Sequence, residues 1–185
     1  MKILVYGSRE FGKVVKQLVL DCGHEFMGFI DDFSESPEII GPYASASVRG
    51  RLSTAHAVVN AVGYRDLYAR RRITKKIISD GYSMPNLIHP KAYVASGVTL
   101  SYGIIIMNSA VVDTNTILDD TVVVWPAAVV NHDCVVRSNT FLSPNATICG
   151  GSTVGSNCFV GAGAVVVDHT DVPENTFIKA NSIFK

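Results

Sequence analysis

The chain has 185 residues, and its 16 basic and 16 acidic side chains give a formal net charge of zero. This length allows one or two domains with a sizeable core, and the charge pattern shows neither a nucleic-acid-binding patch nor an acidic tail. No run is long enough to span a bilayer and the four cysteines have no metal or disulfide spacing, so we expect a cytoplasmic protein without membrane, nucleic-acid or metal partners.

The first part of the chain alternates short apolar strands with helical segments. The apolar spacing of Val14, Val15 and Leu18 is typical of a helix that follows a buried strand. Strands that alternate with helices predict a parallel sheet, so we expect an α/β domain over residues 1–88. The expected strands are Lys2–Tyr6, Glu25–Ile30, His56–Val62 and a short one near Ile39, and the expected helices are Lys13–Cys22 and Asp66–Ser79, with a loop over residues 33–50.

Two features of this domain suit a nucleotide ligand. The loop Gly7–Gly12 joins the first strand to the first helix, where backbone N–H groups can hold a phosphate. It lacks the full Gly-x-Gly-x-x-Gly pattern, so a tight turn without a ligand explains it equally well. Asp31 and Asp32 end the second strand, where carboxylates can accept hydrogen bonds from ribose or base groups. A solvated turn is the alternative for these two residues.

A hexad repeat dominates the rest of the chain. Every sixth residue from Val94 to Val172 is Val, Ile or Leu, a run that chance would give on the order of once in 10⁸ tries. The residue four positions further on is usually small or β-branched, which suits the corner of a narrow prism. The repeat therefore predicts a parallel β-helix over residues 89–185. The fourteen aliphatic positions are Val94, Leu100, Ile106, Val112, Leu118, Val124, Val130, Val136, Leu142, Ile148, Val154, Val160, Val166 and Val172.

The order of these motifs resembles one family across nearly the whole chain. The motifs are Gly7–Gly12, Asp31–Asp32, Ala61–Gly63, Asn86–Pro90 and, within the hexads, Asn131–Asp133. They are similar to those of the sialic-acid O-acetyltransferase-like sugar acyltransferases, which include nucleotide-amino-sugar N-acetyltransferases. The resemblance implies a Rossmann-like nucleotide-sugar-binding domain followed by a left-handed β-helix acyltransferase domain with a C-terminal cap. Three hexads make one coil in that fold, so thirteen complete hexads predict a little over four coils.

The resemblance also implies a function and its residues. We expect a homotrimer that transfers an acetyl group from acetyl-CoA to the amino group of a UDP- or dTDP-linked 4-amino-4,6-dideoxy sugar for surface-glycan biosynthesis. His132 would be the general base and the Gly150 N–H the oxyanion donor, with direct attack and no covalent intermediate. The residues expected to contact CoA are Gly150, Gly151, Ala162 and Gly163, and those expected near the nucleotide sugar are Gly7, Ser8, Asp31, Asp32 and Gly63.

The 18-residue coil that the resemblance implies predicts what surrounds His132. Residue n would lie below residue n+18, so His132 is expected below Gly150 and Asp133 below Gly151. The two glycines would leave a backbone channel beside the imidazole, which would take a proton from the incoming amine or hydroxyl near neutral pH. Asp133 would orient the imidazole or stabilise its cation. A polar corner residue without a catalytic role is the alternative for His132.

The chain departs from the family pattern at three aromatic residues. Phe11, Trp125 and Phe141 stand where the family often has polar residues, and Phe141 is expected to stack below Phe159. We expect the C-terminal part to be about one coil short of the family. The sequence leaves the sugar, the nucleotide, the acyl chain length and the choice between N- and O-transfer open, because an amine and a hydroxyl look alike to a single histidine base. The alternatives are a sugar O-acetyltransferase, a non-catalytic trimeric sugar-nucleotide-binding protein and a carbonic-anhydrase-like β-helix, which the histidine spacing disfavours.

Overall fold

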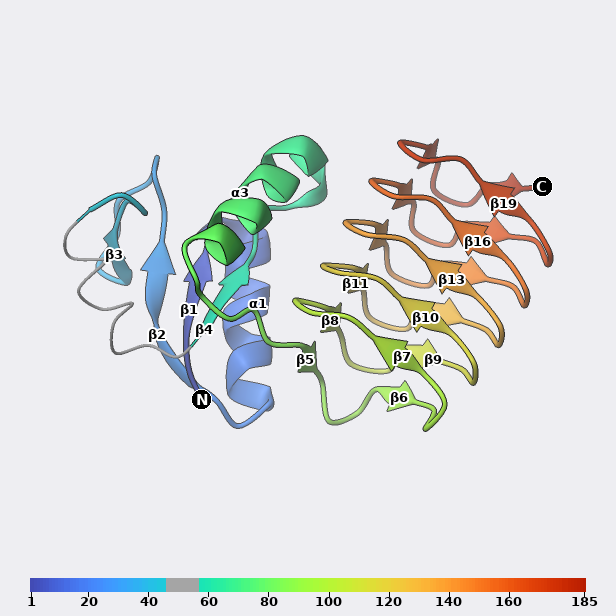
Figure 1. Cartoon of the computed structure of the whole chain (residues 1–185), viewed down its shortest axis with the longest axis horizontal. Helices are drawn as coiled ribbons and strands as arrows, with labels where there is room; N and C mark the ends of the chain where they lie inside the picture. The colour runs from blue at the N-terminus through green and yellow to red at the C-terminus, as the bar shows by residue number, and fades with distance from the viewer. Residues whose placement is uncertain (46–56) are drawn as a thin grey trace. The chain divides into compact units, whose positions relative to one another are not determined.

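The computed structural model describes residues 1–45 and 57–185, and the chain divides into two compact units, Met1–Pro85 and Asn86–Lys185 (Figure 1). The sequence predicted a domain boundary after residue 88, three residues later than the boundary after Pro85 in the structure. Strand β5 (Leu87–Ile88) lies in the second unit because it pairs with β8 (Ile105–Ile106). The expected start of the third strand at His56 and the end of the expected loop over 33–50 lie outside the described residues.

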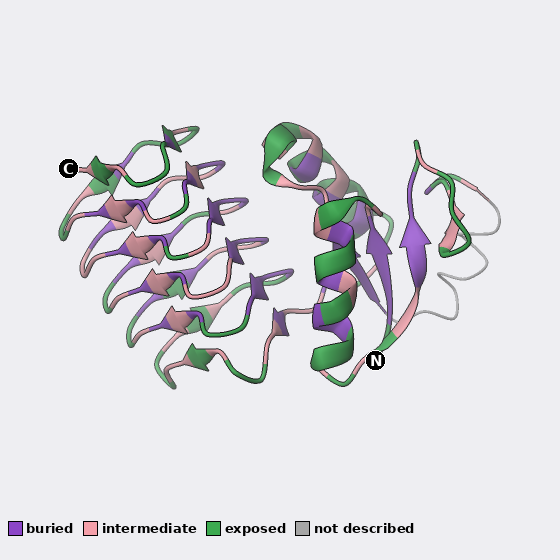
Figure 2. Ribbon diagram, turned by 180° about the vertical axis from the view of Figure 1, so that it is seen from behind, coloured by how far each residue is buried: buried purple, intermediate pink, exposed green. Residues whose placement is uncertain are grey.

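The first unit is an α/β domain built on a parallel four-stranded sheet in the order β3-β2-β1-β4. A helix follows the first strand and another helix ends the unit, whereas the second and third strands follow each other without a helix between them. The apolar centre of the sheet is fully buried, with Leu4, Ile30 and Val58 at 0% exposure (Figure 2). The elements are β1 (Lys2–Tyr6), α1 (Glu10–Asp21), β2 (Glu25–Ile30), β3 (Ile39–Gly41), β4 (Ala57–Asn60), the 3-10 helix η1 (Tyr64–Asp66) and α3 (Leu67–Ser79).

Helix α1 begins at Glu10, three residues before the predicted start. Its first turn includes Gly12, which packs directly on the loop after β1: a Cβ at Gly12 would lie 2.8 Å from the carbonyl carbon of Gly7 and closer still to its oxygen. Only glycine allows this approach, because any side chain would overlap the Gly7 peptide. The loop that precedes the helix is therefore short, and Val15, Leu18 and Val19 are buried along one face of α1.

The second unit is a left-handed parallel β-helix made of two-residue strands. Strands 18 residues apart pair in parallel, as Val123 does with Phe141, and three sheets form its three faces (Figure 1). In sequence, the strands are β5, β6 (Tyr93–Val94), β7 (Thr99–Leu100), β8, β9 (Val111–Val112), β10 (Ile117–Leu118), β11 (Val123–Val124), β12 (Val129–Val130), β13 (Val135–Val136), β14 (Phe141–Leu142), β15 (Thr147–Ile148), β16 (Thr153–Val154), β17 (Phe159–Val160), β18 (Val165–Val166), β19 (Asp171–Val172), β20 (Phe177–Ile178) and β21 (Ile183–Phe184).

The β-helix is longer than the predicted four coils. Two faces carry six strands and one carries five. The extra strands β5, β20 and β21 keep the same hexad register, with Ile88, Ile178 and Phe184 at the inward position. The coil count from Val94 to Val172 was therefore too low, because the register continues on both sides of that run.

Two kinds of residue build each coil. The aliphatic residues and the small residues four positions later fill the interior, where Val130, Cys134, Val136 and Ala146 have no exposure. From Gly103 to Asn181, each corner has one residue with φ near +60°, spaced six residues apart. Asparagine suits this backbone because its short polar side chain tolerates the left-handed region. Six of the non-glycine corner residues are asparagines: Asn115, Asn139, Asn145, Asn157, Asn175 and Asn181.

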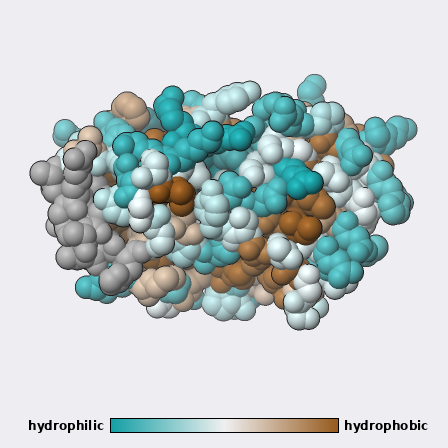
Figure 3. All heavy atoms as spheres, in the orientation of Figure 1, coloured by the Kyte–Doolittle hydropathy of each residue, from teal (hydrophilic) through white to brown (hydrophobic). Residues whose placement is uncertain are grey.

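Apolar side chains also lie on the outside of the β-helix. Phe141 and Phe159 stack with their ring centroids 6.1 Å apart, as predicted, and Phe159 stacks on Phe177 at 4.9 Å. Phe177 is 65% exposed and Ile183 is 71% exposed. Figure 3 shows hydrophobic residues at the surface of this unit among hydrophilic ones. Within the described residues, no helix has the length and apolarity needed to cross a membrane.

Candidate active site

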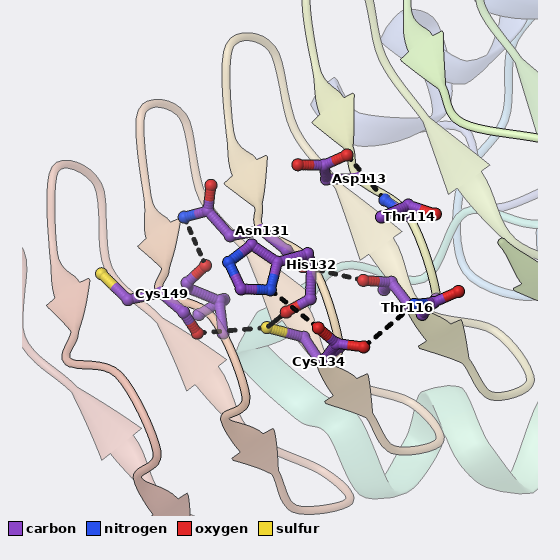
Figure 4. A network of polar contacts seen from close by, with 10 residues as sticks. Asp113, Thr114, Thr116, Asn131, His132, Cys134 and Cys149 are labelled. Carbon is purple, nitrogen blue, oxygen red and sulfur yellow. Dashed lines mark hydrogen bonds and ion pairs between the residues drawn. The ribbon is translucent and has the colours of Figure 1, made fainter. Parts of the chain in front are cut away.

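One edge of the β-helix carries the residues that the sequence singled out around His132. We call it the histidine edge, and it consists of the corners at residues 113–115, 131–133, 149–151 and 167–169. These corners lie between the β9-β12-β15-β18 face and the β10-β13-β16-β19 face and stack at intervals of 18 residues. Figure 4 shows this edge from close by. Functional side chains on it are therefore held by four successive coils.

His132 and Asp133 form a hydrogen-bonded pair at the surface. His132 Nδ1 lies 2.8 Å from Asp133 Oδ2, and the two side chains are 59% and 57% exposed. The Asn115 side-chain amide donates to the other carboxylate oxygen over 3.1 Å. The hydrogen bonds from His132 and Asn115 lower the pKa of Asp133 below its ordinary value.

This pair determines which nitrogen of His132 carries a proton. An ionised carboxylate can only accept a hydrogen bond, so the Nδ1 of the neutral imidazole must carry the hydrogen. Nε2 then holds a lone pair, and it has no hydrogen-bond partner within the described part of the chain. His132 thus offers a free basic nitrogen to the outside of the β-helix.

Gly150 lies against the His132 ring, as the 18-residue register predicts. A Cβ at Gly150 would be 2.7 Å from Cε1 and 2.8 Å from Nε2 of His132, closer than real Cβ atoms approach. The next residue, Gly151, donates its N–H to the His132 carbonyl over 3.1 Å. The Gly150 N–H itself makes no hydrogen bond to any described residue. The basic nitrogen and an unused backbone donor therefore lie side by side.

Hydrogen bonds between coils hold this edge in place (Figure 4). The Thr116 hydroxyl donates to the Asn131 carbonyl over 2.7 Å, and the Asn131 amide donates to the Ile148 carbonyl over 3.0 Å. The Cys134 thiol donates to the Cys149 carbonyl over 3.1 Å, and burial raises its pKa, so it serves packing rather than nucleophilic chemistry. Sequence reasoning missed Asn115 and Thr116, although Asn115 precedes Asp133 by one 18-residue coil.

The expected CoA-contacting residues lie on two edges. Gly150 and Gly151 are on the histidine edge, whereas Ala162 and Gly163 are at the corner between β17 and β18. These corners flank opposite ends of the face that contains β15 and β18. Within one chain, the structure therefore does not bring Gly150–Gly151 and Ala162–Gly163 together.

In the first unit, the predicted residues lie at the carboxyl ends of β1, β2 and β4. Asp31 is buried, and its carboxylate accepts hydrogen bonds from the N–H and hydroxyl of Ser8 and from the N–H groups of Phe33 and Ser34. Burial alone would raise its pKa, but these four hydrogen bonds lower it below the ordinary value. Since four donors satisfy its oxygens, Asp31 shapes the loop rather than presenting a free carboxylate.

Asp32, Gly7 and Gly63 lie at the ends of the strands next to the loop that Asp31 holds. Asp32 is exposed and accepts hydrogen bonds from the Tyr6 hydroxyl and, over 2.7 Å, from the Tyr43 N–H. Burial and the bond to Asp32 raise the pKa of Tyr6 well above its usual range. A Cβ at Gly7 would lie 3.0 Å from the Ala61 carbonyl oxygen, and one at Gly63 would lie 4.0 Å from Phe11 Cβ. The ends of β1 and β4 therefore meet where the sequence predicted a ligand.

Two family profiles match separate parts of the chain. The PglD N-terminal domain matches residues 2–77, and the bacterial transferase hexapeptide family (six repeats) matches residues 133–168. No curated protein matches the chain at a significant level.

Several solved structures are similar over the whole chain. The acetyltransferase domain of PglB from Neisseria gonorrhoeae is 29% identical with a TM-score of 0.89, and the match covers 100% of this chain and 91% of that one. The same domain in complex with acetyl coenzyme A is 27% identical, with a TM-score of 0.87 and coverage of 100% and 90%. PerB from Caulobacter crescentus, in complex with CoA and GDP-perosamine, is 25% identical, with a TM-score of 0.92 and coverage of 100% and 89%. The two profiles and these structures confirm the resemblance to sugar acyltransferases that we inferred from the sequence motifs.

Proposed function

We propose that this chain, which joins a PglD N-terminal domain to bacterial transferase hexapeptide repeats, is a nucleotide-sugar N-acetyltransferase that uses acetyl-CoA. The acceptor is the amino group of a 4-amino-4,6-dideoxy sugar linked to UDP or dTDP, and the product serves surface-glycan biosynthesis. The similar solved proteins, one holding acetyl coenzyme A and another CoA with GDP-perosamine, support the donor and the acceptor class.

One observation carries the proposal: the free Nε2 of His132 lies beside the unused N–H of Gly150. The first supplies a general base whose tautomer Asp133 fixes, and the second supplies a donor for a developing oxyanion. Acyl transfer from a thioester to an amine needs these two groups within reach of one reacting carbon.

The reaction proceeds by direct attack. The sugar amine adds to the thioester carbon while His132 Nε2 removes its proton, and the carbonyl oxygen becomes an oxyanion that accepts a hydrogen bond from the Gly150 N–H. The oxyanion then collapses, the carbon–sulfur bond breaks, and the CoA thiolate takes up the proton from the His132 imidazolium. The products are an N-acetyl sugar and free CoA. Asp133 keeps the imidazole oriented and stabilises its cation during transfer.

The first unit binds the nucleotide sugar in this proposal. The Gly7–Ser8 loop at the start of α1 suits the phosphates, and Asp32 and Gly63 lie beside it, while Asp31 acts by shaping the loop. The active form is a homotrimer. In it, the Gly150–Gly151 corner of one chain faces the Ala162–Gly163 corner of a neighbour, so that both corners line one CoA groove. The apolar side chains outside the β-helix support such an interface.

The test is acetyl-CoA turnover, followed as release of free thiol, against a panel of UDP-, dTDP- and GDP-linked amino sugars. We expect turnover with one 4-amino sugar and a loss of about 10²–10⁴-fold in the His132→Ala variant. Mass spectrometry of the product distinguishes an amide from an ester. His24→Ala, a histidine of the first unit, is the matched control.

Three other outcomes would overturn parts of this proposal. An ester product would move the function to sugar O-acetylation. Full activity in His132→Ala would remove the base from its assigned role. Binding of a nucleotide sugar without turnover of any acceptor would indicate a non-catalytic binding protein.

A further inference from the structure

A second histidine lies directly above the glycine pair on the histidine edge. His169 follows Gly151 by 18 residues, and its imidazole folds back over that glycine: a Cβ at Gly151 would be 2.5 Å from His169 Nδ1 and 2.7 Å from Cε1. His132 lies in the same way against Gly150 from the coil below. The two glycines are therefore held between two imidazoles of one edge.

Backbone hydrogen bonds connect both histidines to the same two glycines, Gly150 and Gly151. Gly151 donates its N–H to the His132 carbonyl over 3.1 Å, and the His169 N–H donates to the Gly150 carbonyl over 3.0 Å. The Gly150 N–H stays free, as described above. The His169 side chain is exposed and makes no hydrogen bond to another described residue. A ring that can donate and accept hydrogen bonds therefore borders the proposed oxyanion site on its upper side.

A turn role explains the backbone of His169 but not its ring. His169 has φ of 51°, in the left-handed region that the corners from Gly103 to Asn181 use, and asparagine meets that need at six other corners. Asn181 shows the same geometry on another edge, where its side-chain oxygen folds over Gly163 and its N–H donates to the Ala162 carbonyl over 2.8 Å. Corner geometry does not require an imidazole at position 169.

The side chains packed against Gly150 and Gly151 limit the direction from which the acyl donor can approach. The lower side of Gly150 is occupied by the His132 ring, where the acceptor amine has to arrive. A thioester whose oxygen accepts from the Gly150 N–H must therefore lead its thiol arm along the upper side of the edge. On that side of the edge the His169 ring lies directly over Gly151 and has free hydrogen-bonding groups.

We propose that His169 is a positioning residue for the acyl donor, whose imidazole hydrogen-bonds the pantetheine amide nearest the thioester. This inference rests on the proposed function. The amide offers both a carbonyl acceptor and an N–H donor, and a neutral imidazole can pair with either. The contact holds the thioester carbon beside His132 Nε2 and the Gly150 N–H without entering the chemical step.

Two variants test this role. His169→Ala removes the ring. We expect the left-handed corner to accept alanine because Ala127 has φ of 58° at another corner of the β-helix. His169→Asn introduces the residue that six other corners carry and also removes the ring. For both, we expect the KM for acetyl-CoA and the Kd of CoA, measured by calorimetry, to rise about three- to tenfold, the loss of one hydrogen bond, with kcat within about twofold. The same rise is expected with S-acetyl-N-acetylcysteamine, a short donor that keeps only the amide beside the thioester.

The control is Asn175→His, which changes a left-handed corner of the same coil on a different edge. It should leave KM and Kd unchanged. Wild-type constants in both His169 variants, or rescue by His169→Asn alone, would overturn the inference, because the second result would assign His169 to the turn. A wild-type protein that neither binds CoA nor turns over acetyl-CoA would instead contradict the proposed function.

Discussion

At the scale of single residues, the site depends on an absent side chain as much as on those present. The His132 ring reaches its place because Gly150 has no Cβ, and Asp133 fixes the tautomer because its own corner backbone directs the carboxylate toward His132. Asn115, one coil below, completes the set by donating to Asp133. Three successive coils thus contribute one residue or pair each.

Gly150→Ala tests this dependence directly. The new methyl group would lie 2.7 and 2.8 Å from ring atoms of His132, so the ring has to turn away. A displacement of this kind costs about 10²-fold in rate, and we expect a fall in kcat of that order while the chain stays folded. Thiol release under saturating substrates measures it.

A double-variant comparison separates a clash from general damage. In a His132→Ala background the ring is gone, so Gly150→Ala should leave the melting temperature unchanged. A melting temperature lowered equally in both backgrounds would show that Gly150 serves the corner and not the ring.

At the scale of elements, the first helix illustrates how backbone contacts set a boundary. The side-chain pattern predicted α1 from Lys13, but the helix begins at Glu10 because Gly12 lets its first turn rest on the Gly7 peptide. The same approach holds the loop that we assign to the nucleotide phosphates. Packing of α1 and the shape of that loop are therefore coupled.

Gly12→Ala should destabilise the first unit. The added Cβ would overlap the Gly7 carbonyl, and an overpacked contact of this kind costs about 3 kcal/mol of the free energy of unfolding. Urea unfolding followed by circular dichroism measures the loss. Val14→Ala, an exposed position on the same helix, is the control and should change stability by less than about 1 kcal/mol. Equal stability in the two variants would contradict the assigned contact.

The sequence predicted those features that a repeat or a regular period encodes. The hexads predicted the β-helix directly, and the 18-residue coil that the family resemblance supplied predicted both the stacking of Phe141 on Phe159 and the contact between His132 and Gly150. The sequence did not predict the start of α1 or the four hydrogen bonds to the Asp31 carboxylate. Both depend on backbone groups that the fold brings together rather than on the side-chain pattern. Asn115 was within reach of the same coil and was overlooked because asparagine is common at these corners.

At the scale of the whole molecule, the two edges of the β-helix pose a geometric problem. Gly150–Gly151 and Ala162–Gly163 lie on different edges of one chain, yet a single CoA groove is assigned to both pairs. A trimer resolves this because a heterologous ring interface brings different surfaces of neighbouring chains together. Each groove then takes one edge from each of two chains, and three equivalent grooves result.

Complementation between two inactive variants tests this arrangement. His132→Ala disables the histidine edge, and Ala162→Trp, at an exposed corner, blocks the other edge without disturbing the core. Each variant alone should be inactive, but in trimers assembled from an equal mixture about a quarter of the grooves receive both intact edges, because each edge is drawn independently. Co-expression with two affinity tags isolates the mixed trimers, each of which has one intact groove of three, and thiol release should then reach about a third of the wild-type rate. If both edges served a site within one chain, every groove in the mixture would carry a defect, and mixing would restore no activity.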